Sequence, residues 1–151
     1  MRTLFKPLLF ICYVGIAASV AIHLRVLMLG RTIPTVLVFT LHLGIFLVTL
    51  PTLGMQRFVK RPYPKAFGRT FWSAVPRWLR NLSWGAFAYF VVVFLWYNFT
   101  HAGPAPRTSG FSPDLLVMFS AGWLSFYAVL AAALRFQIDA GEEVIGTSLE
   151  Q

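Results

Sequence analysis

Charged residues are scarce in this chain. Only 12% of its 151 residues are Asp, Glu, Lys or Arg, and 58% are apolar. A soluble domain has about 25% charged residues and about 45–50% apolar ones. A soluble fold of this length could not cover so much apolar surface with so few charges. A lipid surrounding removes this conflict, so the composition predicts a membrane protein.

Acidic residues and cysteine are rarer still. The chain has five acids, none of which lies in its first three long apolar runs, and Cys12 is its single cysteine. Proton-coupled carriers generally need a carboxylate within the membrane, and Ser-His-Asp or metal–carboxylate hydrolases need an acid as well. One cysteine allows neither an internal disulfide nor a CxxC redox motif. These absences disfavour a small drug exporter and such hydrolases, exclude a CxxC-dependent quinone reductase, and leave no recognisable catalytic constellation.

Long apolar runs are what the chain has instead. Four of them are close to the length of about 20 residues that a helix needs to cross a bilayer core. They cover residues 7–29, 34–55, 82–100 and 113–134. The first run could be a cleaved signal peptide, but it continues well beyond a small-residue site at 19–21, which favours an anchored helix. The sequence therefore predicts an all-α fold, a four-transmembrane-helix bundle over residues 1–135 followed by an acidic, solvated and partly disordered cytoplasmic tail over 136–151.

Boundary residues support these runs. Gly30 is a helix stop after the first run, and Thr32 is an N-cap candidate for the second. The sequence Ser112-Pro113-Asp114 is typical of a helix start, with a cap, a first-turn proline and an acid that suits the helix dipole. Pro51 predicts a kink or an early stop in the second run.

The distribution of basic residues predicts the orientation. Of the 13 Lys and Arg residues, ten lie before the first run, between the second and third runs, or after the fourth. Three lie on the other side: Arg25, Arg31 and Arg107. Because basic residues accumulate on the cytoplasmic side, both termini and the basic connection should face the cytoplasm. A bacterial inner membrane is the expected location.

The connection between the second and third runs predicts a basic amphipathic segment over residues 65–82. Its apolar residues recur every three or four positions, with basic residues on the other side. We expect this segment to lie at the membrane interface, with Phe71 and Trp78 in the acyl boundary and Arg69, Arg77 and Arg80 among anionic headgroups or on a partner. The simpler alternative is that it only fixes topology and anchors the chain. Pro76 favours a kink or division, and nucleic acid is not an expected partner because lipid phosphate would compete for the same arginines.

His23 and His42 are the remaining candidates for a site. They lie about 9 Å and about 12 Å below the same end of two antiparallel helices. His23 shares a stripe with Gly15 and Ser19, which predicts that it points into the bundle, close to His42. The functional hypothesis is a b-type haem or a metal site.

The alternative is that each histidine is neutral and satisfied by a neighbour at a helix interface. Two histidines binding one iron need Cα atoms roughly 12 Å apart, whereas packed helix axes lie about 8–10 Å apart. The helical hairpin would have to splay. A His42–His101 pair would relax that demand, but His101 is expected to be exposed at the outer end of the third run.

The fourth run carries a face of small residues at Ala121, Ser125, Ala128 and Ala132. Such a face predicts tight packing against another helix, in this chain or in a second copy. Trp123 and Tyr127 lie in the middle of the run, so their polar ends should find partners within the bundle.

Three stretches of the chain carry a resemblance. They are residues 41–46 (Leu-His-Leu-Gly-Ile-Phe), 76–80 (Pro-Arg-Trp-Leu-Arg) and 119–127 (Phe-Ser-Ala-Gly-Trp-Leu-Ser-Phe-Tyr). Together they make the chain similar to small uncharacterised bacterial inner-membrane proteins. The resemblance implies a four-helix membrane protein and no particular activity.

Three hypotheses for the function follow. The first is a non-enzymatic accessory, assembly or interaction component of the membrane that binds anionic lipid and another membrane protein or a second copy. The second is a membrane b-haem or metal-binding protein that uses His23 and His42. The third is a small carrier or channel, which the lack of buried charge weakens.

Overall fold

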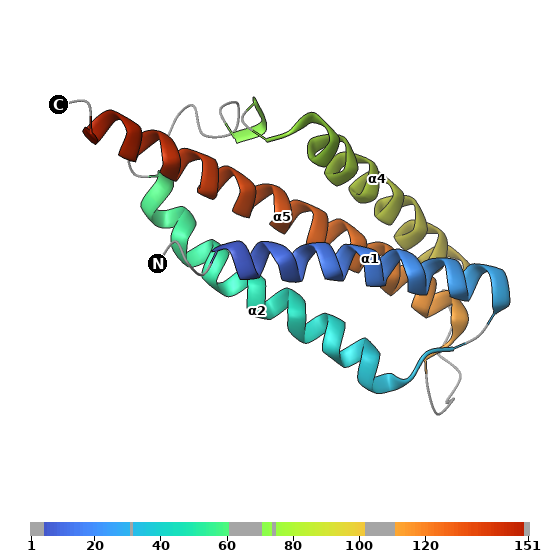
Figure 1. Cartoon of the computed structure of the whole chain (residues 1–151). Coiled ribbons are helices and arrows are strands. Elements are labelled where there is room, and N and C mark those ends of the chain that lie inside the picture. Colours follow the sequence, from blue (N-terminus) through green and yellow to red (C-terminus); the bar gives the residue numbers. More distant parts are fainter. Residues whose placement is uncertain (1–4, 31, 61–70, 74, 102–110, 150–151) are drawn as a thin grey trace.

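Four long helices make up the fold. The computed structural model describes residues 5–30, 32–60, 71–73, 75–101 and 111–149 (Figure 1). The helices are α1 (Phe5–Leu29), α2 (Thr35–Lys60), α4 (Arg77–Thr100) and α5 (Pro113–Leu149), and the described residues contain no strand. Each helix is long and apolar enough to cross a bilayer. The predicted all-α fold with four such helices is therefore confirmed.

Two of the predicted helix boundaries are confirmed. Gly30 has a φ of 59°, and its N–H donates to the carbonyl of Val26 at 2.9 Å. This is the left-handed cap that glycine adopts without a steric penalty. At the start of α5, the Ser112 hydroxyl accepts from the N–H of Leu115 at 3.2 Å, and Asp114 lies in the first turn.

The start and the length of α2 differ from the prediction. The helix begins at Thr35, and the N–H of Leu37 donates to the carbonyl of Pro34, so Thr32 lies outside the first turn and does not cap it. Pro51 lies inside the helix, which continues to Lys60. Of the kink or early stop expected at Pro51, the early stop does not occur. Proline removes one backbone hydrogen bond, and the packing of Val48 and Thr52, both buried beside it, holds the helix across that position.

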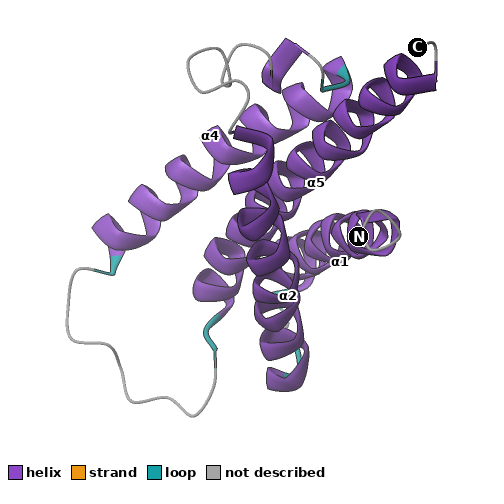
Figure 2. Cartoon of the chain, turned by 90° about the vertical axis from the view of Figure 1, so that its left-hand side faces the viewer, coloured by secondary structure: helices purple, strands orange, loops and turns teal. Residues whose placement is uncertain are grey.

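Helix α5 is the centre of the bundle. It contacts α1, α2 and α4, which lie around it (Figures 1 and 2). Two-thirds (67%) of its most apolar stretch is buried, against 28% for α1, 22% for α2 and 17% for α4. The small face explains this position, because the predicted residues Ala121, Ser125, Ala128 and Ala132 are all buried and let the neighbouring backbones approach.

Tyr127 of α5 joins three helices. Its hydroxyl donates to the carbonyl of Leu41 in α2 at 2.8 Å. Its ring covers Gly15 of α1, where a Cβ atom would lie 2.6 Å from the ring carbons. Only glycine leaves room for this ring, so Gly15 sets how closely α1 packs on α5. The predicted polar partner of Tyr127 is therefore found.

The basic segment before α4 is divided at Pro76. Residues 71–73 are helical, Val75 and Pro76 are not, and α4 begins at Arg77, earlier than the predicted start at residue 82. Arg69 and the rest of 65–70 lie outside the described residues. Of the two effects expected from Pro76, division is therefore the one observed. The interfacial position of the segment stays a prediction.

The fourth helix does not end where the sequence indicated. Helix α5 continues past the predicted end at residue 134 to Leu149. Phe136 and Gln137 are buried, and the rings of Phe136 and Phe71 lie 5.2 Å apart. Arg135 pairs with Asp139 at 3.2 Å. The expected acidic tail after residue 135 is thus helical to Leu149, and its first residues pack in the bundle because two of them are covered by α2 and by residue 71.

Candidate functional site

A hydrogen-bonded cluster holds His23. Its Nδ1 lies 2.7 Å from the hydroxyl oxygen of Ser120 in α5, and its Nε2 lies 2.6 Å from that of Tyr89 in α4. The His23 and Tyr89 rings meet edge to face at 5.3 Å. Three helices therefore meet at one imidazole.

Each polar side-chain atom of this cluster has a hydrogen-bond partner. The Ser120 hydroxyl also lies 2.8 Å from the carbonyl of Leu116, an acceptor only. If Ser120 donates to that carbonyl, it accepts from Nδ1–H of His23, and Nε2 then accepts from the Tyr89 hydroxyl. In the other tautomer Nε2–H donates to the Tyr89 hydroxyl and Nδ1 accepts from the Ser120 hydroxyl, which then gives up its bond to the Leu116 carbonyl. Either way, both nitrogens of His23 are used by the protein itself.

His42 is held quite differently. Its Nδ1 lies 2.9 Å from the carbonyl of Val38, one turn earlier in α2. Its ring meets Phe119 and Trp123 of α5 edge to face, each at a centroid distance of 5.2 Å. The expected polar partner of Trp123 is not found, because its Nε1 has no hydrogen-bond partner among the described residues. His42 is thus fixed by its own helix and by aromatic packing.

The two histidines have separate sets of contacts. Both lie at the same level of α5, since their partners there are the adjacent residues Phe119 and Ser120. They share no partner, and no hydrogen bond or ring contact joins them among the described residues. The predicted shared depth agrees with this geometry. A common haem or metal site does not fit it, because His23 could bind iron only after losing a bond to Ser120 or Tyr89.

No other metal site is evident in the part of the chain that the structure describes. It contains no group of three His, Cys, Asp or Glu side chains that could hold a metal ion. Cys12 is fully buried in α1.

His101 lies at the end of α4, beside the first turn of α5. It follows α4, stacks on Tyr97 at 4.5 Å, and its Nε2 lies 3.3 Å from a carboxylate oxygen of Asp114. Its side chain is 37% exposed, as expected. Asp114 therefore lies in the first turn of α5, where an acid suits the helix dipole, and also pairs with the residue that follows α4. This pair was not predicted, because Asp114 was explained by the helix dipole alone.

The described part of the basic segment has two kinds of residue. Trp78 and Arg77 are exposed, whereas Phe71 is buried against Phe136. Arg80 donates to the carbonyl of Trp72 at 3.2 Å, which bridges the break at Pro76. Contacts of Arg77, Arg80 and Trp78 with lipid or a partner stay a prediction.

The chain matches no protein-family model, no curated protein and no solved structure in the comparisons made. A functional conclusion therefore depends on the geometry of the bundle.

Proposed function

We propose that this chain is an integral protein of a bacterial inner membrane that acts as a non-enzymatic accessory or assembly component through lateral contacts. The observation that carries the proposal is the unequal use of its helices. Helix α5 is enclosed by its neighbours, whereas α2 and α4 use less than a quarter of their apolar stretches for internal packing. Their remaining faces are available to lipid and to another helix.

One of these faces suits a helix better than lipid alone. Six exposed residues of α4 recur every three or four positions and form a stripe, which we call the α4 stripe: Asn81, Gly85, Ala88, Val92, Leu95 and Phe99. Nothing lies within 4 Å of a Cβ atom placed on Gly85. Apolar area does not drive helix association within lipid, whereas small residues that allow close backbone approach do. Gly85 and Ala88 supply such a place.

Site-specific cross-linking in native membranes tests the lateral contact. A photoreactive residue at Ala88 should give a discrete protein adduct. The matched control is the same residue at Leu24 of α1, which is exposed on another helix and should react with lipid only. Adding Gly85→Leu should remove the Ala88 adduct. Equal adducts at Ala88 and Leu24, or none at Ala88, would contradict the proposal.

The proposed orientation places both termini and Arg77 in the cytoplasm and Thr32 outside, because ten of the 13 basic residues lie on one side. Thr32→Cys in intact cells should react with a membrane-impermeant maleimide, and Arg77→Cys should react only after lysis. Cys12 is fully buried, so the unmodified chain is the blank. The reverse labelling pattern would invert the topology.

A further inference from the structure

The hydrogen-bond partner of His42 defines its tautomer. A carbonyl oxygen only accepts, so the contact with Val38 requires that Nδ1 carries the proton. In the neutral imidazole, Nε2 is then an acceptor. Nε2 has no hydrogen-bond partner among the described residues, and it is not among their enclosed, unpaired side-chain atoms. It is therefore open to the surface.

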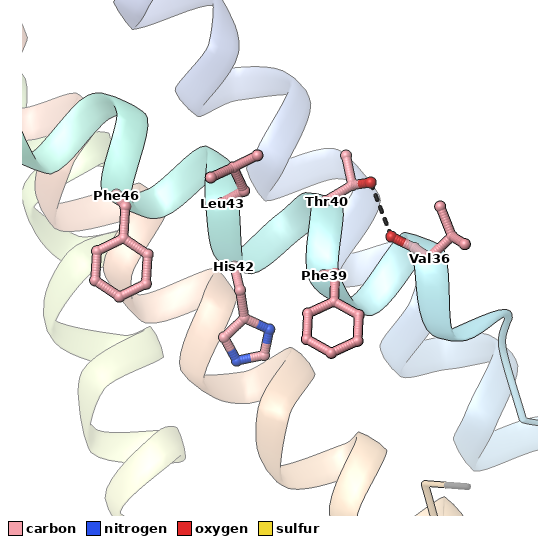
Figure 3. A pocket seen from close by; sticks show the side chains of 6 residues that line it. All are labelled: Val36, Phe39, Thr40, His42, Leu43 and Phe46. Atoms are coloured by element: carbon pink, nitrogen blue, oxygen red, sulfur yellow. Dashed lines mark hydrogen bonds between the residues drawn. The ribbon is translucent and has the colours of Figure 1, made fainter.

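Nε2 belongs to a residue that lines a depression on α2. The depression, which we call the His42 depression, is lined by Val36, Phe39, Thr40, His42, Leu43 and Phe46 (Figure 3). The Thr40 hydroxyl donates to the carbonyl of Val36 at 2.8 Å. With that proton used and Nδ1–H of His42 given to Val38, these side chains offer acceptors but no free donor. A molecule bound here must bring its own O–H or N–H group.

Aromatic side chains flank His42 along α2 (Figure 3). Figure 3 shows the rings of Phe39, His42 and Phe46 on the same side of α2, with His42 between the two phenylalanines. Phe119 and Trp123 support the imidazole from α5. Phe39 and Phe46 are 64% and 61% exposed, so their faces are not covered by the protein. Aromatic faces and edges favour a flat ring as the group between them.

The surroundings of the site narrow the class of ligand further. His42 lies eight residues after Pro34, about 12 Å along the helix from its outer end. If the bundle spans a bilayer, Nε2 lies among acyl chains, where an unpaired polar atom is unfavourable and water is scarce. A ligand would enter sideways from the lipid.

From these observations we propose that the His42 depression binds a lipid-soluble aromatic ring that carries a hydroxyl group, the phenol or hydroquinone class. The hydroxyl donates to Nε2 of His42, and the ring lies beside Phe39 and Phe46. This inference rests on the proposed membrane location, but it does not depend on the α4 stripe or on any protein partner.

The test observes the acceptor atom directly. The full chain is labelled with ¹⁵N-histidine and reconstituted in lipid nanodiscs, and 4-nonylphenol is added. An unprotonated imidazole nitrogen shifts when it accepts a hydrogen bond, so the His42 Nε2 resonance should move in a saturable way. The matched probe, 4-nonylanisole, has a methyl ether in place of the hydroxyl and should leave this resonance unchanged. The His23 resonances should not move with either probe.

Variants of exposed phenylalanines check the aromatic part. Phe46→Ala should weaken phenol binding by about 2- to 10-fold, the range expected for loss of one aromatic contact. Phe10→Ala removes a similarly exposed ring from α1 and should leave the affinity unchanged.

An unchanged His42 resonance, or equal shifts with both probes, would overturn the proposal. Labelling of Thr32→Cys and Arg77→Cys reports membrane insertion separately. A negative result in correctly inserted protein therefore counts against this site and leaves the proposed location intact.

Discussion

His23 and His42 have the same chemistry at the same level of the bundle, yet their surroundings are opposite. His23 meets Ser120 and Tyr89 and has both nitrogens paired, whereas His42 meets Phe119 and Trp123 and keeps one nitrogen open. Phe119 and Ser120 are neighbours on α5 and point about 100° apart around the helix axis. One step along the central helix therefore separates a structural histidine from a candidate binding residue.

The different surroundings of the two histidines depend on how α1 and α2 pack on α5. Gly15→Leu should disturb this packing most. A side chain at Gly15 would collide with the ring of Tyr127, which also holds α2 through Leu41. We expect a loss of about 3 kcal/mol in the free energy of unfolding, at the upper end for overpacking. Reversible unfolding in mixed micelles measures it. Gly85→Leu is the matched control, because nothing lies near that position, and it should not lower stability, since leucine is favoured over glycine inside a helix by up to about 1 kcal/mol.

Replacing His23, whose two ring nitrogens are both paired, should give the next largest loss in the free energy of unfolding. His23→Leu removes the hydrogen bonds of Nδ1 to Ser120 and of Nε2 to Tyr89, and we expect a loss of about 1–2 kcal/mol, since one such bond contributes about 0.5–1.5 kcal/mol net. Tyr89→Phe alone should cost less, because Tyr89 is partly exposed. In a double-mutant cycle, Tyr89→Phe should cost almost nothing once His23 is gone. Additive losses would show that the cluster is not one unit.

The sequence was sufficient for the four helices, because runs of about 20 apolar residues and their caps are local signals. It was also sufficient for the buried small face of α5, whose Ala and Ser residues recur at helical spacing. The continuation of α5 beyond residue 134 was not predictable in this way. Phe136 and Gln137 are covered by segments distant in the sequence, and their packing outweighs the polar character of the following residues.

The candidate site was predictable only in part. Similar spacing from a short loop predicted that His23 and His42 lie at a similar depth, and their partners on α5 agree with that. Nothing local indicated which side of α5 each would face. The tyrosine at position 89 lies in an aromatic stretch of α4 without a distinguishing pattern, so its bond to His23 depends on how α4 packs on α5.

His101 should give a loss of stability between those expected at His23 and at His42. Asp114→Asn removes the charge partner of His101 and the first-turn acid of α5. Both interactions are exposed, so the combined loss should be no more than about 1 kcal/mol. It should shrink in about 1 M salt, where the screening length is about 3 Å. A loss that is independent of salt would assign the effect to something other than charge.

Replacing His42, whose Nε2 has no partner among the described residues, should give the smallest effect on stability. His42→Phe keeps a ring of similar shape against Phe119 and Trp123. It removes only the Nδ1–H bond to Val38, whose carbonyl retains the backbone hydrogen bond expected one turn later in the helix. No buried polar group is left unpaired, so the free energy of unfolding should change by less than about 0.5 kcal/mol.

The same substitution, His42→Phe, should abolish any preference of the nanodisc-bound protein for 4-nonylphenol over 4-nonylanisole. A loss near that of His23→Leu would make His42 a structural residue like its neighbour. Unchanged stability together with a lost preference would separate the two histidines by function.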